Sequence, residues 1–173
     1  MRMNNKLYIM MGVPGSGKTT WCKNNINFDE SVYISRDTIR FSILKPNEPY
    51  FSKEKEVYKT FTNQIAQALK RGKNVYADQT SLDEKARAKL INSLEDRSYE
   101  IHVIWLNTPL GQCLKQNSLR TGLSRVPDES IIQMSKRLTR PTWAEGIRYL
   151  HIITNGEEKI IDLEEEANKE WTL

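Results

Sequence analysis

The residues with the clearest chemical meaning lie near the amino end, in the order Gly12-Val13-Pro14-Gly15-Ser16-Gly17-Lys18-Thr19. This order fits G-x-x-x-x-G-K-[ST], a loop whose backbone N–H groups surround phosphate oxygens. The motif predicts that Lys18 reaches the β- and γ-phosphates of ATP and that the Thr19 hydroxyl holds Mg²⁺. The alternative is an ordinary glycine-rich turn. The residues expected to bind the nucleotide here are Gly12, Pro14, Gly15, Ser16, Gly17, Lys18, Thr19 and Thr20.

Such a loop needs a strand before it and a helix after it. Residues 7–11 are continuously apolar, as expected of a central strand covered on both faces. A helix is expected from Lys18 to about residue 25, and its dipole would favour the phosphates. Both flanking elements are therefore predicted, which favours the nucleotide site over the turn.

Further strands are predicted to alternate with helices along the chain. The strands are expected at residues 31–35, 75–77, 101–106 and 148–153, with Ile160-Ile161 as an optional short addition. This alternation predicts a three-layer α/β domain with a mainly parallel, five-stranded sheet. In such sheets ligands bind outside the carboxyl ends of the strands.

Arg36-Asp37 follows the second predicted strand and therefore lies at this edge. Phosphoryl transfer to a hydroxyl needs a carboxylate that orients and deprotonates the acceptor, and Asp37 is our candidate. Helix capping is its alternative role. Arg40 lies one helical turn further, on the same face, where it would bind an acceptor phosphate or pair with a surface acid.

Asp78 and Thr80 follow the third predicted strand and reach the same edge. Asp78 would act through a Mg²⁺-bound water or anchor a mobile arginine, with structural capping as its alternative. Thr80 lies where it would touch a substrate phosphate, although hydroxyls at strand ends often only cap helices. Asp78 and Thr19 are the two residues expected to hold the metal ion.

A mobile, arginine-bearing lid is expected at about residues 114–140. Arg120 closes a predicted helix, and Arg125 lies in the loop beyond it. Either side chain could swing over the phosphates as an arginine finger. The alternative for Arg120 is a favourable interaction with the helix dipole alone.

The length of 173 residues fits a single domain, residues 1–173. No apolar run approaches the length of a membrane span, so no membrane association is expected. Two cysteines without zinc-like spacing favour a reducing, cytoplasmic setting. An acidic tail is expected at about residues 156–173; it carries a net charge of −5, which leaves +9 for the rest of the chain. That positive body is weak support for an anionic substrate.

Three other side chains are given structural roles. His102 and His151 lie in predicted strands without a partner acid at suggestive spacing. Trp143 could stack a base, but packing or an exposed lid contact is the favoured interpretation.

These motifs together resemble the kinase domain of bacteriophage and bacterial polynucleotide 5′-hydroxyl kinases, within the AAA_33 and zeta-toxin-like group of P-loop kinases. The resemblance covers roughly residues 6–155. Besides the P-loop, it depends on three segments in matching order: residues 35–40, 78–82 and 116–127.

The resemblance implies ATP and Mg²⁺ as cofactors and catalytic roles for Lys18, Asp37 and Arg120. Asp37 would activate the acceptor hydroxyl, and Arg120 would clamp the donor phosphates. Arg36, Asp37, Arg40, Asp78 and Thr80 would form the substrate side, with Arg40 on the phosphate next to the acceptor nucleoside. Gln116 stands where related kinases often have another lid arginine, and Arg125 is the candidate to compensate.

The resemblance also implies a nucleic-acid 5′ end as substrate. No phosphatase or ligase segment is recognised in the chain, so such a partner for end repair would be a separate chain. The sequence predicts no oligomeric state. Two alternatives stay open: a P-loop kinase of a small molecule, such as a nucleoside, nucleotide sugar or modified base, and a non-catalytic ATP-binding switch.

Overall fold

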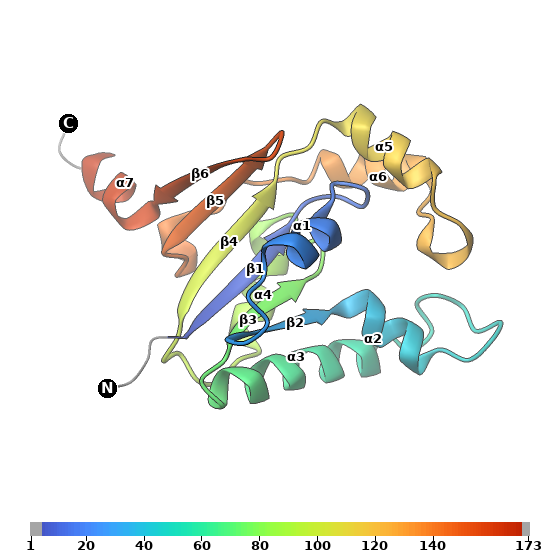
Figure 1. The fold of residues 1–173 in the computed structure, drawn as a ribbon, viewed down its shortest axis with the longest axis horizontal. Coiled ribbons are helices and arrows are strands. Elements are labelled where there is room, and N and C mark those ends of the chain that lie inside the picture. Colours follow the sequence, from blue (N-terminus) through green and yellow to red (C-terminus); the bar gives the residue numbers. More distant parts are fainter. Residues whose placement is uncertain (1–4, 171–173) are drawn as a thin grey trace.

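A six-stranded sheet forms the centre of the molecule, in the order β2-β3-β1-β4-β5-β6 (Figure 1). The computed structural model describes residues 5–170. Strands β1 to β5 are parallel, and β6 pairs antiparallel with β5. The apolar run before the glycine-rich loop forms β1, between β3 and β4, where Leu7, Ile9 and Met11 have no exposed surface. The predicted α/β fold with a mainly parallel sheet is therefore confirmed.

The strands are β1 (Lys6–Met11), β2 (Ser31–Ser35), β3 (Asn74–Asp78), β4 (Glu100–Leu106), β5 (Tyr149–Thr154) and β6 (Glu157–Asp162). The α-helices are α1 (Lys18–Asn25), α2 (Arg36–Ile43), α3 (Glu54–Lys70), α4 (Glu84–Asn92), α5 (Leu110–Ser118), α6 (Asp128–Ser135) and α7 (Leu163–Glu170). Two short 3₁₀ helices complete the list: η1 (Gly122–Ser124) and η2 (Trp143–Glu145).

The expected count of five strands is wrong, because β6 adds a full sixth strand. Its six residues pair with β5 along their whole length, from Thr154 opposite Glu157 to Tyr149 opposite Asp162. The described part of the expected acidic tail consists of β6 followed by α7. Charged residues at the start of β6 face solvent on the sheet edge, where they oppose pairing with another chain.

Helices cover the two faces of the sheet unequally. Helices α3 and α4 pack on one face, where Phe61 and Ile65 of α3 and Leu90 of α4 are fully buried. The opposite face is covered by α1, through Cys22 and Ile26 against Met10 and Ile104. The predicted three layers are therefore present. On this second face, the short α1 is the only helix of the described residues that contributes to the buried apolar cluster.

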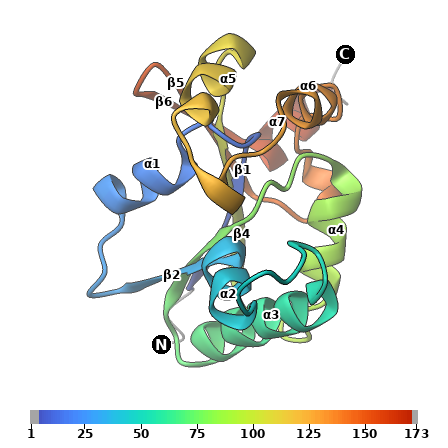
Figure 2. The ribbon, with the colours of Figure 1, turned by 90° about the vertical axis from the view of Figure 1, so that its right-hand side faces the viewer.

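A third apolar cluster lies at the edge where the parallel strands end. Ile131 of α6 and Cys113 of α5 are fully buried there, against Val13 of the glycine-rich loop. Helices α5 and α6 and the turn between them therefore stand over this edge, opposite α2 and the loop that follows it (Figure 2).

Among the helices of residues 5–170, none combines the length and apolar character needed to cross a bilayer.

Candidate active site

The glycine-rich loop connects β1 to the first turn of α1 and is fixed from both sides. The Gly12 N–H donates to the carbonyl oxygen of Thr80 at 3.1 Å, which ties the loop to the segment after β3. On the other side, the Thr108 hydroxyl donates to the carbonyl oxygen of Ser16 at 2.8 Å. The loop is therefore held in place by the segments that follow its two neighbouring strands.

The geometry of this loop fits a phosphate group. Gly12 has φ +149°, and a Cβ there would lie 2.5 Å from Ser16 Oγ. Gly15 has φ +83°, and a Cβ there would lie 2.3 Å from the carbonyl oxygen of Cys113. Ser16 Oγ is buried and has no hydrogen-bond partner within residues 5–170. An unpartnered buried hydroxyl in a loop that has no room for a side chain at Gly12 and Gly15 is the arrangement expected where phosphate oxygens bind.

Lys18 lies in the first turn of α1 and bends back over the loop. Its Nζ donates to the carbonyl oxygens of Gly12 at 2.7 Å and Val13 at 3.2 Å. Burial lowers the pKa of Lys18, and the nearby charge of Arg120 lowers it further, while Asp78 and Asp37 oppose the shift. Because burial disfavours the charged form, negative phosphates would stabilise the ammonium group at this place.

Asp78 ends β3 and faces the loop. Its Oδ2 accepts hydrogen bonds from the Thr19 hydroxyl at 3.1 Å and the Tyr33 hydroxyl at 2.5 Å. Within residues 5–170 no three histidine, cysteine, aspartate or glutamate side chains converge into a metal site. Mg²⁺ at kinase sites is commonly held by one or two carboxylates together with substrate phosphates, so a single carboxylate beside a hydroxyl fits that ion.

Asp37 lies in the first turn of α2, directly after β2, and its side chain is 63% exposed. Ser35 caps this helix by accepting the Thr38 N–H, so Asp37 is free of the capping role. Its Oδ1 accepts hydrogen bonds from the Arg40 guanidinium and, at 2.8 Å, from the Tyr50 hydroxyl. The carboxylate is thus open to solvent on one side and held from behind on the other.

Arg36 and Arg40 share one carboxylate, that of Glu54 at the start of α3. Arg40 donates to both Glu54 oxygens, at 2.9 and 3.2 Å, and Arg36 donates to Oε1. Burial opposes ionisation of Glu54, but the hydrogen bonds and charges of the two arginines outweigh it and lower its pKa. Arg36 also donates to Gln79 at 3.1 Å, so it links α2 to the segment after β3.

Arg40 is only 4% exposed, and its guanidinium is occupied by Asp37, Tyr50 and Glu54. Its nearest ring is Tyr50, whose centroid lies 4.4 Å from the guanidinium carbon. In this structure Arg40 therefore orients Asp37.

The lid contains α5, η1 and α6. Its loop is held by Asn117, which is fully buried and exchanges hydrogen bonds with both the N–H and the carbonyl of Val126. Arg120 is exposed, and its guanidinium lies 3.5 Å from the carbonyl oxygen of Ser124. Its positive charge is close enough to Lys18 to lower the pKa of that lysine. Arg125 and Gln116 are exposed, and no side-chain bond of either is found within the described residues.

The structure brings most of the predicted site residues together. The glycine-rich loop, Asp37, Asp78 and Thr80 meet at one edge of the sheet, and Arg36 and Arg40 stand behind Asp37. Thr20 lies exposed on α1 beside Thr19, and Pro14 is half-buried within the loop. The two lid arginines are not joined to this cluster by a side-chain contact within the described residues: Arg120 contacts only the Ser124 carbonyl of its own loop, and Arg125 has no side-chain bond there.

Four site residues were not predicted from the sequence, namely Tyr33, Tyr50, Glu54 and Thr108. Each contacts the site across a distance in the chain that no local motif spans. For Glu54 the sequence offered one usable signal: an acidic residue is common in the first turn of a helix, and Glu54 begins α3.

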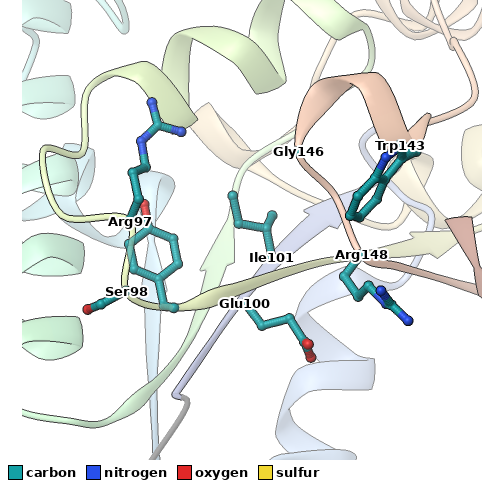
Figure 3. A pocket seen from close by; sticks show the side chains of 8 residues that line it. Arg97, Ser98, Glu100, Ile101, Trp143, Gly146 and Arg148 are labelled. Atoms are coloured by element: carbon teal, nitrogen blue, oxygen red, sulfur yellow. The ribbon is translucent and has the colours of Figure 1, made fainter. Parts of the chain in front are cut away.

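A pocket of about 400 Å³ lies elsewhere, between Arg97 on one side and Trp143 and Arg148 on the other (Figure 3). It is at the amino ends of β4 and β5, the edge opposite the glycine-rich loop. Trp143, 40% exposed, therefore does not face the nucleotide site. His102 and His151 bond to each other at 2.9 Å, and each has a partner acid that its spacing did not suggest, Glu100 for His102 and Glu158 for His151.

Comparison with protein families agrees with this geometry. The sequence profile of the family AAA_33, described as an AAA domain, matches residues 7–141. The chain belongs to the AAA_33 family of P-loop kinase domains. The match covers β1 to the end of the lid, so this P-loop kinase domain includes the glycine-rich loop, Asp37, Asp78 and Arg120.

Three similar proteins place the domain among diverse relatives. Transcription factor bHLH140 of Arabidopsis thaliana is 27% identical over 116 residues, which are 66% of this chain and 11% of that protein. A chain of the Pnkp1/Rnl/Hen1 RNA repair complex superposes with a TM-score of 0.68 at 23% identity, over 80% of this chain and 45% of that one. A sugar kinase from Janibacter sp. superposes with a TM-score of 0.60 at 15% identity, over 97% and 93%.

This P-loop kinase domain thus spans less than half of the repair-complex chain and nearly all of the sugar kinase. Both structural likenesses show a shared fold.

Proposed function

We propose that this P-loop kinase domain transfers the γ-phosphoryl group of ATP to the 5′-hydroxyl of an RNA or DNA end. The observation that carries the proposal is the exposed Asp37 carboxylate, held by Arg40 and Tyr50 at the same sheet edge as the P-loop. A carboxylate so placed lies on the acceptor side of a donor phosphate bound in the loop.

The donor side is assigned to the P-loop and the residues around it. The loop N–H groups and the N-terminus of α1 would bind the phosphates of ATP, and Lys18 would leave the loop carbonyls for the β- and γ-phosphates. Thr19 and Asp78 would hold Mg²⁺, whose charge would help to neutralise the transferred group. Arg120 would approach the phosphates from the lid.

On the acceptor side, Asp37 would take the proton of the 5′-hydroxyl. That oxygen forms a bond to the γ-phosphorus, and the bond between this phosphorus and the β–γ bridging oxygen breaks, which leaves ADP. Arg40 would position Asp37 directly, and Arg36 would hold Glu54, the carboxylate that Arg40 also bonds. A contact between Arg40 and the phosphate next to the acceptor nucleoside would require one of its present carboxylate partners to move.

Three observations support a polynucleotide as the acceptor. The order of Arg36, Asp37 and Arg40 matches polynucleotide 5′-hydroxyl kinases. The fold is similar to that of a chain in an RNA repair complex. The chain outside residues 156–173 carries a net charge of +9, which suits an anionic polymer. The proposal includes a ligase or phosphatase on another chain as a partner in end repair.

A kinase of a small molecule is the second candidate. The fold match with the sugar kinase favours it. This match covers 93% of the sugar kinase chain, whereas the match with the repair-complex chain covers 45% of that chain.

An acceptor screen with labelled ATP and Mg²⁺ tests the proposal. Its arms are a 5′-hydroxyl oligonucleotide, the same oligonucleotide with a 5′-phosphate, free nucleosides, and gluconate with hexoses. We expect labelling of the 5′-hydroxyl oligonucleotide alone. Labelling of a sugar instead would establish the second candidate, and ATP binding without transfer to any acceptor would indicate a non-catalytic switch.

A further inference from the structure

Three aromatic side chains, Phe41, Tyr50 and Phe51, form a cluster on the surface beside Asp37. We call them the aromatic platform. The ring centroids of Tyr50 and Phe51 are 4.7 Å apart, and those of Phe41 and Tyr50 are 6.2 Å apart. Phe51 is 69% exposed and Phe41 is 43% exposed. Single exposed rings are ordinary, but contacting rings that stay in solvent indicate a binding surface.

Local structure keeps these rings out of the core. Helix α2 buries Ile39 against the sheet, and Phe41 lies on its outer side. Tyr50 and Phe51 follow Pro49 in the loop between α2 and α3. The Arg40 guanidinium lies 4.4 Å from the Tyr50 ring centroid and 5.8 Å from that of Phe51. The guanidinium thus contacts Tyr50 and Phe51 by cation–π interactions, and the Phe51 side chain still stays mostly in solvent.

The platform is joined directly to the proposed general base. The Tyr50 hydroxyl donates to Asp37 Oδ1 at 2.8 Å and accepts from Arg40 at 2.9 Å. A planar group stacked on this surface would therefore lie next to the hydroxyl that Asp37 deprotonates.

The surroundings of the platform are positively charged and partly apolar. Residues 36–55 carry a net charge of +2, and residues 110–140, which contain the lid, carry +4. Two of the basic residues in the second range, Arg137 and Arg140, are paired with acids outside it, Asp83 and Glu166. Leu119 and Leu123 of the lid are 78% and 56% exposed. The lid loop and the α2–α3 loop stand at the same edge of the sheet, as both views show (Figures 1 and 2). Aromatic faces within a basic surface suit single-stranded nucleic acid, whose bases stack while its phosphates meet the positive charge.

We propose that the aromatic platform stacks the nucleobases at the 5′ end of a single-stranded polynucleotide and so delivers the terminal 5′-hydroxyl to Asp37. This inference rests on the proposed function and names its substrate class more narrowly. Phe51, the most exposed ring, supplies the main stacking face, and Phe41 extends it.

Binding of a single-stranded 5′-hydroxyl oligonucleotide with a fluorophore at its 3′ end tests the platform by anisotropy. A second oligonucleotide keeps the same phosphates but is abasic at its first three positions. The variants are Phe51→Ala, Phe41→Ala and Phe51→Trp. The matched control is Phe28→Ala, because Phe28 is also exposed, at 57%, but lies before β2 at the opposite edge of the sheet.

Base stacking contributes about 1–3 kcal/mol per base, so we expect Phe51→Ala to weaken binding of the base-bearing oligonucleotide by about 5- to 150-fold. Phe41→Ala should weaken it less. Phe51→Trp should retain binding, the abasic oligonucleotide should bind wild type and Phe51→Ala equally, and Phe28→Ala should behave as wild type.

The proposal is overturned if wild type binds both oligonucleotides equally, or if Phe51→Ala weakens both to the same extent or neither. Labelling of 5′-hydroxyl ends by the wild-type protein distinguishes failure of the platform proposal from failure of the proposed kinase function. If labelling occurs and Phe51→Ala has no selective effect, the platform fails while the proposed function stands. If no end is labelled, both fail.

Discussion

The Tyr50 hydroxyl donates a hydrogen bond of 2.8 Å to Oδ1 of Asp37, across the loop that joins α2 to α3. Arg40 donates to the same carboxylate oxygen and to the Tyr50 hydroxyl, which closes a triangle of three side chains. Burial, together with the charge of Asp37, raises the pKa of Tyr50 to about 12. The phenol therefore keeps its proton and stays a donor to Asp37 at neutral and moderately alkaline pH.

Tyr50→Phe should lower kcat for phosphoryl transfer by about 10- to 100-fold, because a hydrogen bond to a charged group contributes about 1.5–3 kcal/mol. The KM for ATP should not change, since the lost bond orients the acceptor side, and the retained ring should preserve oligonucleotide binding. Steady-state kinetics with both substrates measures this. Tyr8→Phe, on the sheet face covered by α1, is the control. An equal rise in the KM for ATP would show that Tyr50 acts on the whole site.

Proton uptake should accompany ATP binding at Lys18. Burial lowers the pKa of this lysine in the free protein, and bound phosphates would raise it again. At pH values between the two pKa values, binding therefore takes up a proton. Calorimetry of ATP binding in two buffers with different ionisation enthalpies, at alkaline pH, measures it. Lys18→Met should bind ATP more weakly and without this uptake, and the same uptake in the variant would assign the proton to another group.

Removal of the buried Arg87 side chain should strongly lower the free energy of unfolding, because Arg87 forms a buried ion pair with Glu145. It is fully buried, bonds Glu145 at 2.7 and 2.9 Å, and donates to the Thr139 carbonyl at 3.0 Å. Arg87→Met leaves the Glu145 charge buried and should lower the free energy of unfolding by about 3–5 kcal/mol.

The matched control is Arg137→Met. Arg137 also forms an ion pair, with Asp83 at the start of α4, but its side chain is 61% exposed. That loss should stay below about 1 kcal/mol. Urea unfolding compares the variants, and addition of Glu145→Gln to Arg87→Met should restore part of the loss. Equal losses for Arg87→Met and Arg137→Met would contradict the buried pair.

His102 should make the fold sensitive to mild acid. Burial lowers its pKa from 6.5 to about 4, outweighing the hydrogen bond with Glu100, which raises it. The unfolded chain therefore binds more protons between these values, so the contribution of His102 is complete above pH 6.5 and is lost as the pH falls through about 4. Thermal midpoints at about pH 7 and pH 5 should differ less in His102→Gln than in wild type. An unchanged difference would exclude His102 as the cause.

The sequence allowed the positions of the glycine-rich loop and of the residues around it to be predicted. The spacing from Gly12 to Thr19 specifies the loop, and a parallel sheet brings residues after its strands to one edge, so Asp37 and Asp78 could be placed there without coordinates. The bond between Thr19 and Asp78, 59 positions apart, is the direct result of that topology.

The partners that orient the acceptor side could not be predicted, because they are fixed by tertiary packing. Glu54 lies 14 positions from Arg40 and meets it only because α3 starts beside α2. Among the 26 lysines and arginines, nothing local marks Arg87 as fully buried. The sixth strand was predicted only as an optional short segment at Ile160-Ile161, because the residues that open β6 are charged and exposed and lack the apolar run of a core strand.

Single-turnover transfer from labelled ATP to a 5′-hydroxyl oligonucleotide by Asp37→Asn tests the central claim most directly. Loss of a general base costs about 100- to 10,000-fold, so the rate should fall by that factor while ATP binds as tightly as in wild type. Asp29→Asn, at an exposed acid on the opposite edge of the sheet, should transfer at the wild-type rate. Transfer by Asp37→Asn at the wild-type rate would contradict the assignment of Asp37 as the base that activates the acceptor.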